Sequence, residues 1–105
     1  MPREELFTCG TWTVRAGRED DFVAAWTDLA EWTTENFEDA GWARLVQQRD
    51  EPRRFLSFGP WPSEELVAEW RGSDGFRQRV GHMQEMLESF EPGLFDARAQ
   101  VGGGP

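Results

Sequence analysis

The sequence contains no lysine, no isoleucine and no tyrosine, and it has one cysteine and one histidine among 105 residues. The single cysteine, Cys9, excludes an internal disulfide. No apolar run approaches the roughly 20 residues that a membrane-spanning helix needs. Residues 1–5 lack the apolar stretch of a secretion signal. We therefore expect a cytoplasmic protein without a transmembrane segment.

Positive charge is also scarce: all 11 basic residues are arginine, 20 residues are acidic, and the formal net charge is −9. An acidic chain repels phosphate backbones and anionic lipid surfaces, which argues against nucleic acid and membranes as partners. One histidine and one cysteine do not provide the clustered ligands of a metal site. No glycine-rich loop follows a strand and opens a helix, so a nucleotide or flavin fingerprint is absent. We expect neither a metal nor a cofactor.

Large aromatic side chains are abundant, with six Trp and eight Phe. Each such ring can bury about 150–250 Å², whereas a domain of this length has a small core. Part of the aromatic surface is therefore expected to contact a partner chain or to line a ligand pocket. The length fits a single domain over residues 1–101, and the glycine-rich residues 102–105 are interpreted as a flexible tail.

The first half of the chain alternates between two kinds of apolar spacing. In residues 6–14 every second residue, from Leu6 to Val14, falls on one face, and the segment is rich in Thr and aromatics. This pattern predicts a strand. After Gly17 the apolar residues have helical spacing up to Gly41, a residue suited to a left-handed helix end. Two further strands, over residues 42–49 and 54–61, flank an Asp-Glu-Pro turn and are expected to form a hairpin.

The second half predicts a broken helix and one more strand. Ser63, followed by two glutamates, has the chemistry of a helix start. The apolar residues Leu66, Val67 and Trp70 follow with helical spacing until Gly72 interrupts them. Ser73 and Asp74 then begin a second helical piece. Helical spacing continues to Phe90, and Pro92 is expected to end the helix. Apolar and polar residues alternate over residues 95–101, which are predicted to form the last strand.

The order of elements is βαββαβ, typical of ferredoxin-like α+β domains with one antiparallel sheet and helices on one face. The strands carry apolar residues on both faces, since Leu56 and Phe58 alternate with Phe55 and Trp61. Helices cover one face only, so the other face needs a second sheet. We therefore expect a homodimer in which two sheets pack face to face, a dimeric α/β barrel.

Two segments carry a resemblance to a known family: residues 55–65 (FLSFGPWPSEE) and residues 70–76 (WRGSDGF). They resemble antibiotic biosynthesis monooxygenase domains, in which a strand ends near an aromatic residue before Ser-x-Glu and Trp-x-x-Ser-x-x-Phe. In element order the resemblance extends over about residues 5–101. It implies a dimer with a substrate pocket between the sheet and the helices of each protomer. Some members oxidise aromatic polyketides or quinols with O₂ and no cofactor, and others degrade haem.

The sequence departs from this pattern at polar positions. Quinol-oxidising relatives often place Tyr, Asn or Arg near the helical Trp, whereas Phe76 stands where a Tyr is expected and Leu66 lies one turn before Trp70. The haem-degrading branch has an axial His about ten residues after that Trp. Here Val80 takes this position, and His82 lies two residues further on, some 200° around the helix. The resemblance therefore disfavours haem degradation.

The candidate catalytic residues are Trp70 and His82. Trp70 is expected to form the pocket wall while it also fills space between helix and sheet. His82 is the candidate general base at the pocket mouth, with a solvated position on the flank of its helix as the alternative. Arg44 can hold a substrate phenolate or form an inter-subunit ion pair. The apolar candidates with a core or interface position as the alternative are Trp12, Phe58, Trp61 and Met83, and Phe76 and Met86 are further candidates for substrate contact near Trp70.

The leading functional hypothesis, implied by the resemblance, is a cofactor-independent monooxygenase that oxidises a small aromatic polyketide or quinol. A deprotonated, electron-rich phenol can pass an electron to O₂ itself, so the protein need only orient it, stabilise the anion and exclude water. Two alternatives stay open. One is a non-catalytic dimeric module that binds a hydrophobic small molecule. The other is a cyclase or isomerase that uses His82 as a base and needs no oxygen.

Overall fold

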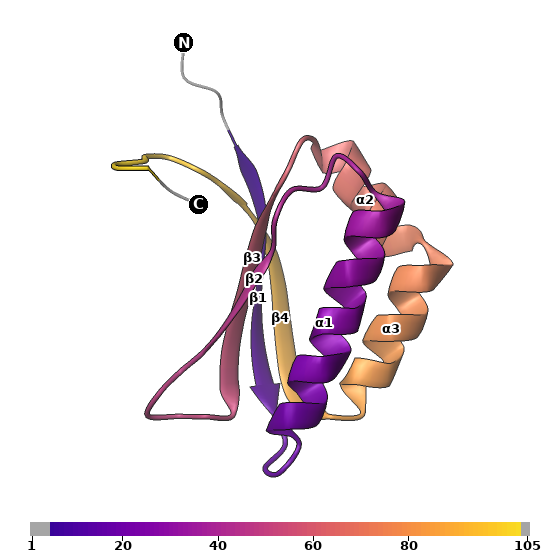
Figure 1. Ribbon diagram of the computed structural model, residues 1–105, viewed down its shortest axis with the longest axis vertical. Coiled ribbons are helices and arrows are strands. Elements are labelled where there is room, and N and C mark those ends of the chain that lie inside the picture. The colour runs from indigo at the N-terminus through magenta and orange to yellow at the C-terminus, as the bar shows by residue number, and fades with distance from the viewer. Residues whose placement is uncertain (1–4, 104–105) are drawn as a thin grey trace.

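The computed structural model describes residues 5–103, and Figure 1 shows two layers, a sheet and a set of helices. Expectations for residues 1–4 and 104–105 lie outside this range. The elements in chain order are β1 (Leu6–Val14), α1 (Glu19–Asn36), β2 (Arg44–Gln47), β3 (Arg54–Trp61), α2 (Glu64–Gly72), α3 (Asp74–Gln84) and β4 (Leu87–Asp96). No helix in the described range is long and apolar enough to cross a membrane.

The sheet is antiparallel throughout, and its strand order is β2-β3-β1-β4. The three helices cover one face of it (Figure 1). The central strand β1 pairs with β3 from Leu6 opposite Trp61 to Thr13 opposite Arg54. This topology confirms the α+β, ferredoxin-like fold, with its second helical region divided into α2 and α3.

Two serines determine where α2 and α3 begin. The Ser63 hydroxyl accepts a hydrogen bond from the Leu66 amide (3.1 Å) at the start of α2. Ser73 has an extended backbone, and its hydroxyl donates to the Trp70 carbonyl (2.7 Å) and accepts from the Phe76 amide (3.4 Å). One side chain therefore closes α2 and caps α3. This local arrangement holds Trp70 and Phe76 on either side of the break.

The region after α1 differs from the prediction. α1 ends at Asn36, whose side-chain amide donates to the Trp32 carbonyl (2.8 Å). The prediction of a left-handed helix end at Gly41 is wrong, because Gly41 does not have a positive φ. A Cβ there would lie 3.0 Å from Pro60 Cγ, so close packing against β3 accounts for this glycine. β2 is also shorter than the predicted strand over residues 42–49.

The C-terminal region differs most from the prediction. α3 ends at Gln84, and the apolar residues expected to continue that helix belong to β4. Phe90 lies opposite Trp12 of β1, and the two rings stack with centroids 3.8 Å apart. Pro92 lies within β4 instead of ending a helix, because an edge strand leaves alternate N–H groups without partners in the sheet. Residues 97–101 lie outside the strand.

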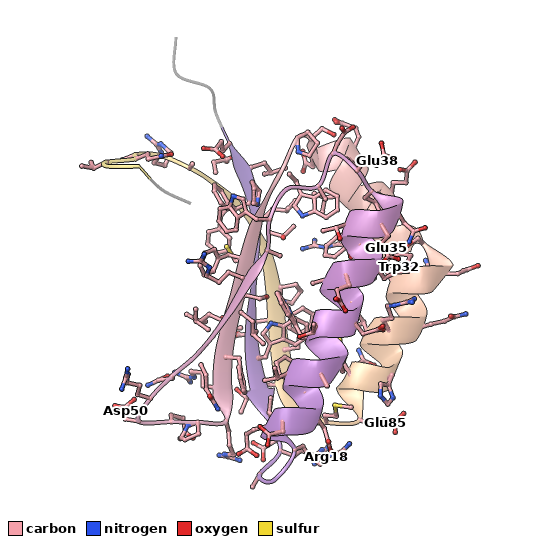
Figure 2. The ribbon with its side chains drawn as sticks, viewed as in Figure 1. Arg18, Trp32, Glu35, Glu38, Asp50 and Glu85 are labelled. Carbon is pink, nitrogen blue, oxygen red and sulfur yellow. The ribbon has the colours of Figure 1, made fainter. Side chains whose placement is uncertain are left out.

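The core lies between the sheet and the helices. Figure 2 shows side chains filling this space, while acidic residues such as Glu35 and Glu38 lie on the outer surface. Phe22 of α1 contacts both Trp12 and Phe55, with ring centroids 5.2 and 5.0 Å apart. The buried core residues are Trp12, Val14, Phe22, Leu29, Phe55, Met83, Met86 and Leu87.

The sheet face opposite the helices carries several exposed apolar side chains, and no helix in the described range covers it (Figure 1). Leu56 is 47% exposed and Phe95 is 56% exposed. Phe7, Trp42 and Phe58 form a cluster at one end of this face, with successive ring centroids 6.2 and 5.9 Å apart. Exposed apolar patches of this kind mark interaction surfaces. We call this surface the open face.

Candidate functional site

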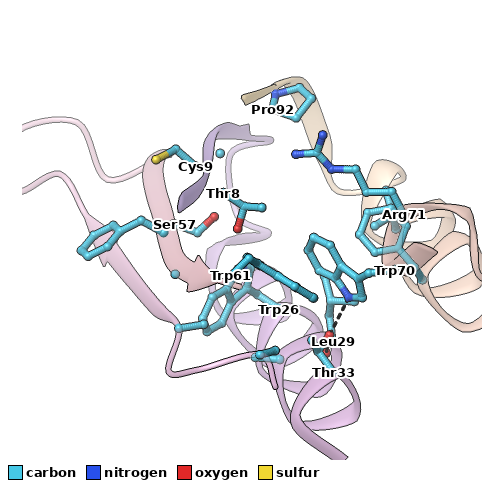
Figure 3. Close-up of a pocket in the computed structure, with 18 of the residues that line it drawn as sticks. Thr8, Cys9, Trp26, Leu29, Thr33, Ser57, Trp61, Trp70, Arg71 and Pro92 are labelled. Carbon is cyan, nitrogen blue, oxygen red and sulfur yellow. Dashed lines mark hydrogen bonds between the residues drawn. The ribbon is translucent and has the colours of Figure 1, made fainter. Parts of the chain in front are cut away.

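A cavity of about 240 Å³ lies between the sheet and the helices (Figure 3). Strands β1, β3 and β4 contribute residues to its floor, and α1, α2 and α3 contribute to the opposite wall. This is the place that the resemblance implies for a substrate pocket. The lining includes Thr8, Gly10, Trp12, Thr33, Ser57, Trp61, Trp70, Arg71, Phe76 and Phe90.

One wall of the cavity is a continuous series of aromatic rings. Trp61, at the end of β3, lies 4.7 Å from Trp70 of α2, measured between ring centroids. Trp70 in turn lies 4.6 Å from Phe76 of α3 in an edge-on arrangement. Trp61 is buried, whereas Trp70 and Phe76 are half-buried. These rings offer a planar ligand dispersion contacts and stacking.

The orientation of Trp70 is maintained by a short chain of hydrogen bonds. Its indole Nε1 donates to Thr33 Oγ1 (2.9 Å), and Thr33 Oγ1 donates to the Leu29 carbonyl (2.7 Å). Figure 3 shows the Trp70–Thr33 bond at the edge of the cavity. Thr33 is only 6% exposed. Because its N–H is already used, Trp70 serves the cavity as an apolar surface and not as a donor.

The floor of the cavity carries a small polar group. Trp12 Nε1 donates to Ser57 Oγ (2.9 Å), which leaves the serine O–H free to donate to a ligand. Figure 3 shows the Ser57 and Thr8 hydroxyls directed into the cavity. Gly10 lies between these residues, and a Cβ there would be 3.0 Å from both Ser57 Oγ and Trp12 Nε1. The missing side chain therefore keeps the polar floor accessible.

Arg71 is the one charged side chain among the described residues that line the cavity. It follows Trp70 at the end of α2 and is half-buried. Figure 3 shows its guanidinium extending toward Pro92 at the side of the cavity. Arg18, Arg53 and Arg79 each pair with a carboxylate, whereas Arg71 forms no ion pair within residues 5–103.

The sequence profile described as antibiotic biosynthesis monooxygenase matches residues 7–82, which include both β1 and β3 of the cavity floor and the aromatic wall. The chain belongs to the antibiotic biosynthesis monooxygenase family. The match confirms the resemblance carried by residues 55–65 and 70–76. No curated protein sequence matches the chain.

Solved structures similar to this family member share its fold at low sequence identity. SnoaB, a cofactor-independent oxygenase from Streptomyces nogalater, is 18% identical with a TM-score of 0.85, over 96% of this chain and 100% of SnoaB. Protein SO0527 from Shewanella oneidensis is 20% identical with a TM-score of 0.79, over 91% and 93% of the two chains. A conserved protein from Methanosarcina mazei Go1 is 17% identical with a TM-score of 0.77, over 87% and 90%.

His82 lies outside the cavity of this family member. The inward stripe of α3 contains Phe76, Val80 and Met83, and His82 lies about 120° around the helix from it. The imidazole is exposed in a depression between α1 and α3, next to the ion pair of Arg79 with Asp28 (3.1 Å). The expected position at the pocket mouth is therefore wrong, and the solvated alternative describes the residue.

The structure brings Trp61, Trp70 and Phe76 together in the wall and places the two methionines elsewhere. Met83 is 0% exposed and Met86 is 3% exposed, and both pack in the core, because α3 turns into β4 directly after them. Neither lines the cavity: the core alternative describes Met83, whereas the expectation that Met86 contacts the substrate does not fit its place in the core.

The remaining predicted site residues belong to β2 and β3. Phe58 contributes to the lining through its strand, while its ring packs against Trp42 (5.9 Å between centroids). Arg44 is exposed on β2 opposite Phe58, away from the cavity. Cys9 lies on the same face of the sheet, and burial raises the pKa of its thiol. These residues thus belong to the open face.

Sequence reasoning missed several polar lining residues, of which Thr8, Thr33, Ser57 and Arg71 matter most for the chemistry of the cavity. Thr8 and Ser57 share the inward face of their strands with Trp12 and Trp61, and this alternation was visible in the sequence. Thr33 and Arg71 had no such signal. Thr33 lies in a polar stretch of α1, and Arg71 has the spacing of an ordinary basic residue in the last turn of a helix.

Proposed function

We propose that this chain is a cofactor-independent monooxygenase that uses O₂ to oxidise a small planar aromatic compound in the cavity. The observation that carries the proposal is the pairing of an aromatic wall with a small polar floor, in a cavity between sheet and helices. A volume of about 240 Å³ lies below the usual ligand-pocket range of about 300–1,000 Å³, which restricts the ligand to a small molecule. Family membership and the shared fold with SnoaB support the proposal.

The chemistry uses the reactivity of the substrate with O₂. For an activated ring methylene the balance is R₂CH₂ + O₂ → R₂C=O + H₂O. The carbon loses four electrons, one oxygen atom enters the product, and the other leaves as water with both hydrogens. The first step is electron transfer from the substrate anion to O₂. The protein holds the ring against Trp61 and Trp70 and donates a hydrogen bond from Ser57.

A non-catalytic binding module is the second candidate. Its support is that no carboxylate or imidazole lines the cavity within the described part of the chain, and that the Trp70 N–H is already used by Thr33. The cyclase or isomerase alternative required His82 as a base. With His82 on the outer side of α3, no observation favours that alternative.

The apolar open face supports the proposal that two copies of the chain pack sheet on sheet. Leu56 and Phe95 are the most exposed large apolar side chains of the described strands, and both lie on the open face. A stable interface of this kind is expected to bury more than about 1,200 Å² in total. The cavities lie on the other side of each sheet, so each protomer keeps its own.

Oxygen uptake tests the enzymatic proposal directly. Purified protein is mixed with an anthrone or a quinol, O₂ consumption is recorded, and products are identified by mass spectrometry with ¹⁸O₂. For a methylene substrate the proposal expects one O₂ consumed and one ¹⁸O incorporated per product. Ser57→Ala is expected to lower kcat/KM about tenfold, whereas the control Ser89→Ala, at an exposed position of β4, is expected to leave it unchanged.

The same experiment separates the alternatives. Saturable binding without O₂ consumption favours the binding module. Turnover that proceeds equally well under nitrogen favours an isomerase or cyclase. Either outcome would overturn the oxygenase proposal.

A further inference from the structure

We propose that Arg71 is the anion-binding residue of the cavity, so that the ligand is an aromatic compound carrying an anionic oxygen. The inference deepens the proposed function and depends on it for the identity of the cavity as the substrate site. It concerns the charge of the ligand and the residue that recognises it.

The first support is the lack of an ionic partner for Arg71. A guanidinium stays protonated at any physiological pH, and partial burial of a charge is unfavourable unless the charge is compensated. The chain has 20 acidic residues, yet none of those described pairs with Arg71. Asp74 has the i,i+3 spacing of a helical ion pair, but the helix breaks at Ser73 between the two residues. The positive charge is therefore available to a ligand.

The second support is the composition of the lining. Apart from Arg71, the described lining side chains are uncharged, and most are aromatic or aliphatic. Attraction between opposite charges is stronger beside apolar walls than in bulk water, so a single guanidinium determines the charge preference of such a cavity. A cationic ligand would meet Arg71 with no carboxylate to offset the repulsion. A neutral ligand would leave the guanidinium without a partner.

The third support is the missing base. No imidazole or carboxylate among the described lining residues can remove a proton from a bound phenol or enol. A ligand that is already an anion when it binds avoids this step, and its proton stays with bulk water. Arg71 then favours the ionised form and can donate two parallel N–H bonds to a carboxylate or one to a phenolate oxygen. Ser57 supplies a further donor from the floor.

Calorimetric titration with matched pairs of ligands tests the inference in the absence of turnover. One pair is 2-naphthoate with 2-naphthamide, and the other is 2,4-dinitro-1-naphtholate with its methyl ether. The members of each pair have similar shape and differ in charge, and the two pairs distinguish a carboxylate from a phenolate. Each is titrated into the unmodified protein, Arg71→Gln, Arg71→Lys and Arg77→Gln. Arg77 is a matched control, because it is an exposed arginine of α3.

At least one anion is expected to bind the unmodified protein tenfold or more tightly than its neutral partner. Arg71→Gln is expected to weaken binding of that anion by about tenfold to hundredfold, with little change in the affinity for the neutral compound. Arg71→Lys should retain part of the preference, and Arg77→Gln all of it. The pair with the larger preference identifies the anionic group.

Equal affinity for the anionic and neutral members of both pairs in the unmodified protein would overturn the inference, and this comparison needs no variant to fold. An unchanged anion preference in Arg71→Gln would overturn it as well. O₂ uptake is measured separately. Arg71-dependent anion binding without O₂ consumption would overturn the oxygenase proposal alone, whereas unchanged O₂-dependent kcat/KM in Arg71→Gln would overturn the Arg71 inference alone.

Discussion

Replacement of Thr33 by valine tests whether the hydrogen bond to Trp70 supports both the fold and the cavity wall. Thr33→Val nearly preserves shape but removes the acceptor of the Trp70 Nε1 bond (2.9 Å). It also removes the donor of the bond to the Leu29 carbonyl (2.7 Å). The first loss leaves a polar N–H at the edge of an apolar cavity without its partner. The second loss matters less, because the Leu29 carbonyl lies within α1, where it can still accept a backbone hydrogen bond of the helix.

The expected cost follows from these two bonds. An ordinary hydrogen bond contributes about 1 kcal/mol net, and a buried donor left without a partner costs about 1–3 kcal/mol. Trp70 is half-buried, so water can partly satisfy its N–H, and the lower part of this range applies. We expect Thr33→Val to lower the free energy of unfolding by about 1–2 kcal/mol. In a domain of about 100 residues this corresponds to a fall in Tm on the order of 10 °C.

Thermal and urea unfolding followed by circular dichroism measure this cost. Thr27→Val is the matched control, because the exposed Thr27 donates the same kind of bond to the Val23 carbonyl (2.7 Å) without a partner indole. Its expected effect is below about 0.5 kcal/mol. In a Trp70→Phe background, Thr33→Val should cost less than in the unmodified protein. Equal effects of Thr33→Val and Thr27→Val, or full additivity with Trp70→Phe, would refute the reasoning.

Three further predictions concern the cavity floor, the open face and the histidine. Gly10→Ala should destabilise the protein by about 1–3 kcal/mol and weaken ligand binding, since its Cβ would lie 3.0 Å from Ser57 Oγ; unfolding and calorimetry measure both effects. Leu56→Glu should give a 12.1 kDa species by light scattering where the unmodified protein gives twice that mass, and a monomeric unmodified protein would contradict the dimer. His82→Ala should keep kcat/KM within about twofold, and a loss of the 10²–10⁴-fold typical of a general base would contradict its external position.

Local patterns in the sequence determined much of the fold. Alternation within residues 6–14 and 54–61 predicted β1 and β3 with the bounds that the structure has. The serine cap at position 73 predicted the break between α2 and α3. Apolar residues on both sides of β3 predicted the open face, and the motif around Trp70 predicted the aromatic wall. Each of these signals depends on residues close together in the chain, where periodicity and capping act.

Tertiary structure decided the points that local patterns cannot resolve. The spacing of Met83, Leu87 and Phe90 fits a helix, yet pairing with β1 and stacking on Trp12 place Phe90 in an edge strand that accepts Pro92. Such pairing joins residues far apart in sequence, so it leaves no mark on short-range spacing.

The candidate site depended on packing in the same way. His82 lies about 120° around α3 from the residues of that helix that pack toward the sheet. This angle places its imidazole on the exposed side of the helix and not at the pocket mouth. The Trp12–Ser57 bond joins residues 45 positions apart, and the Trp70–Thr33 bond joins residues 37 apart. Arg71 acquires its position because α2 ends beside the cavity. Residue types were readable from the sequence, whereas the face that each side chain presents was decided by how the helices pack on the sheet.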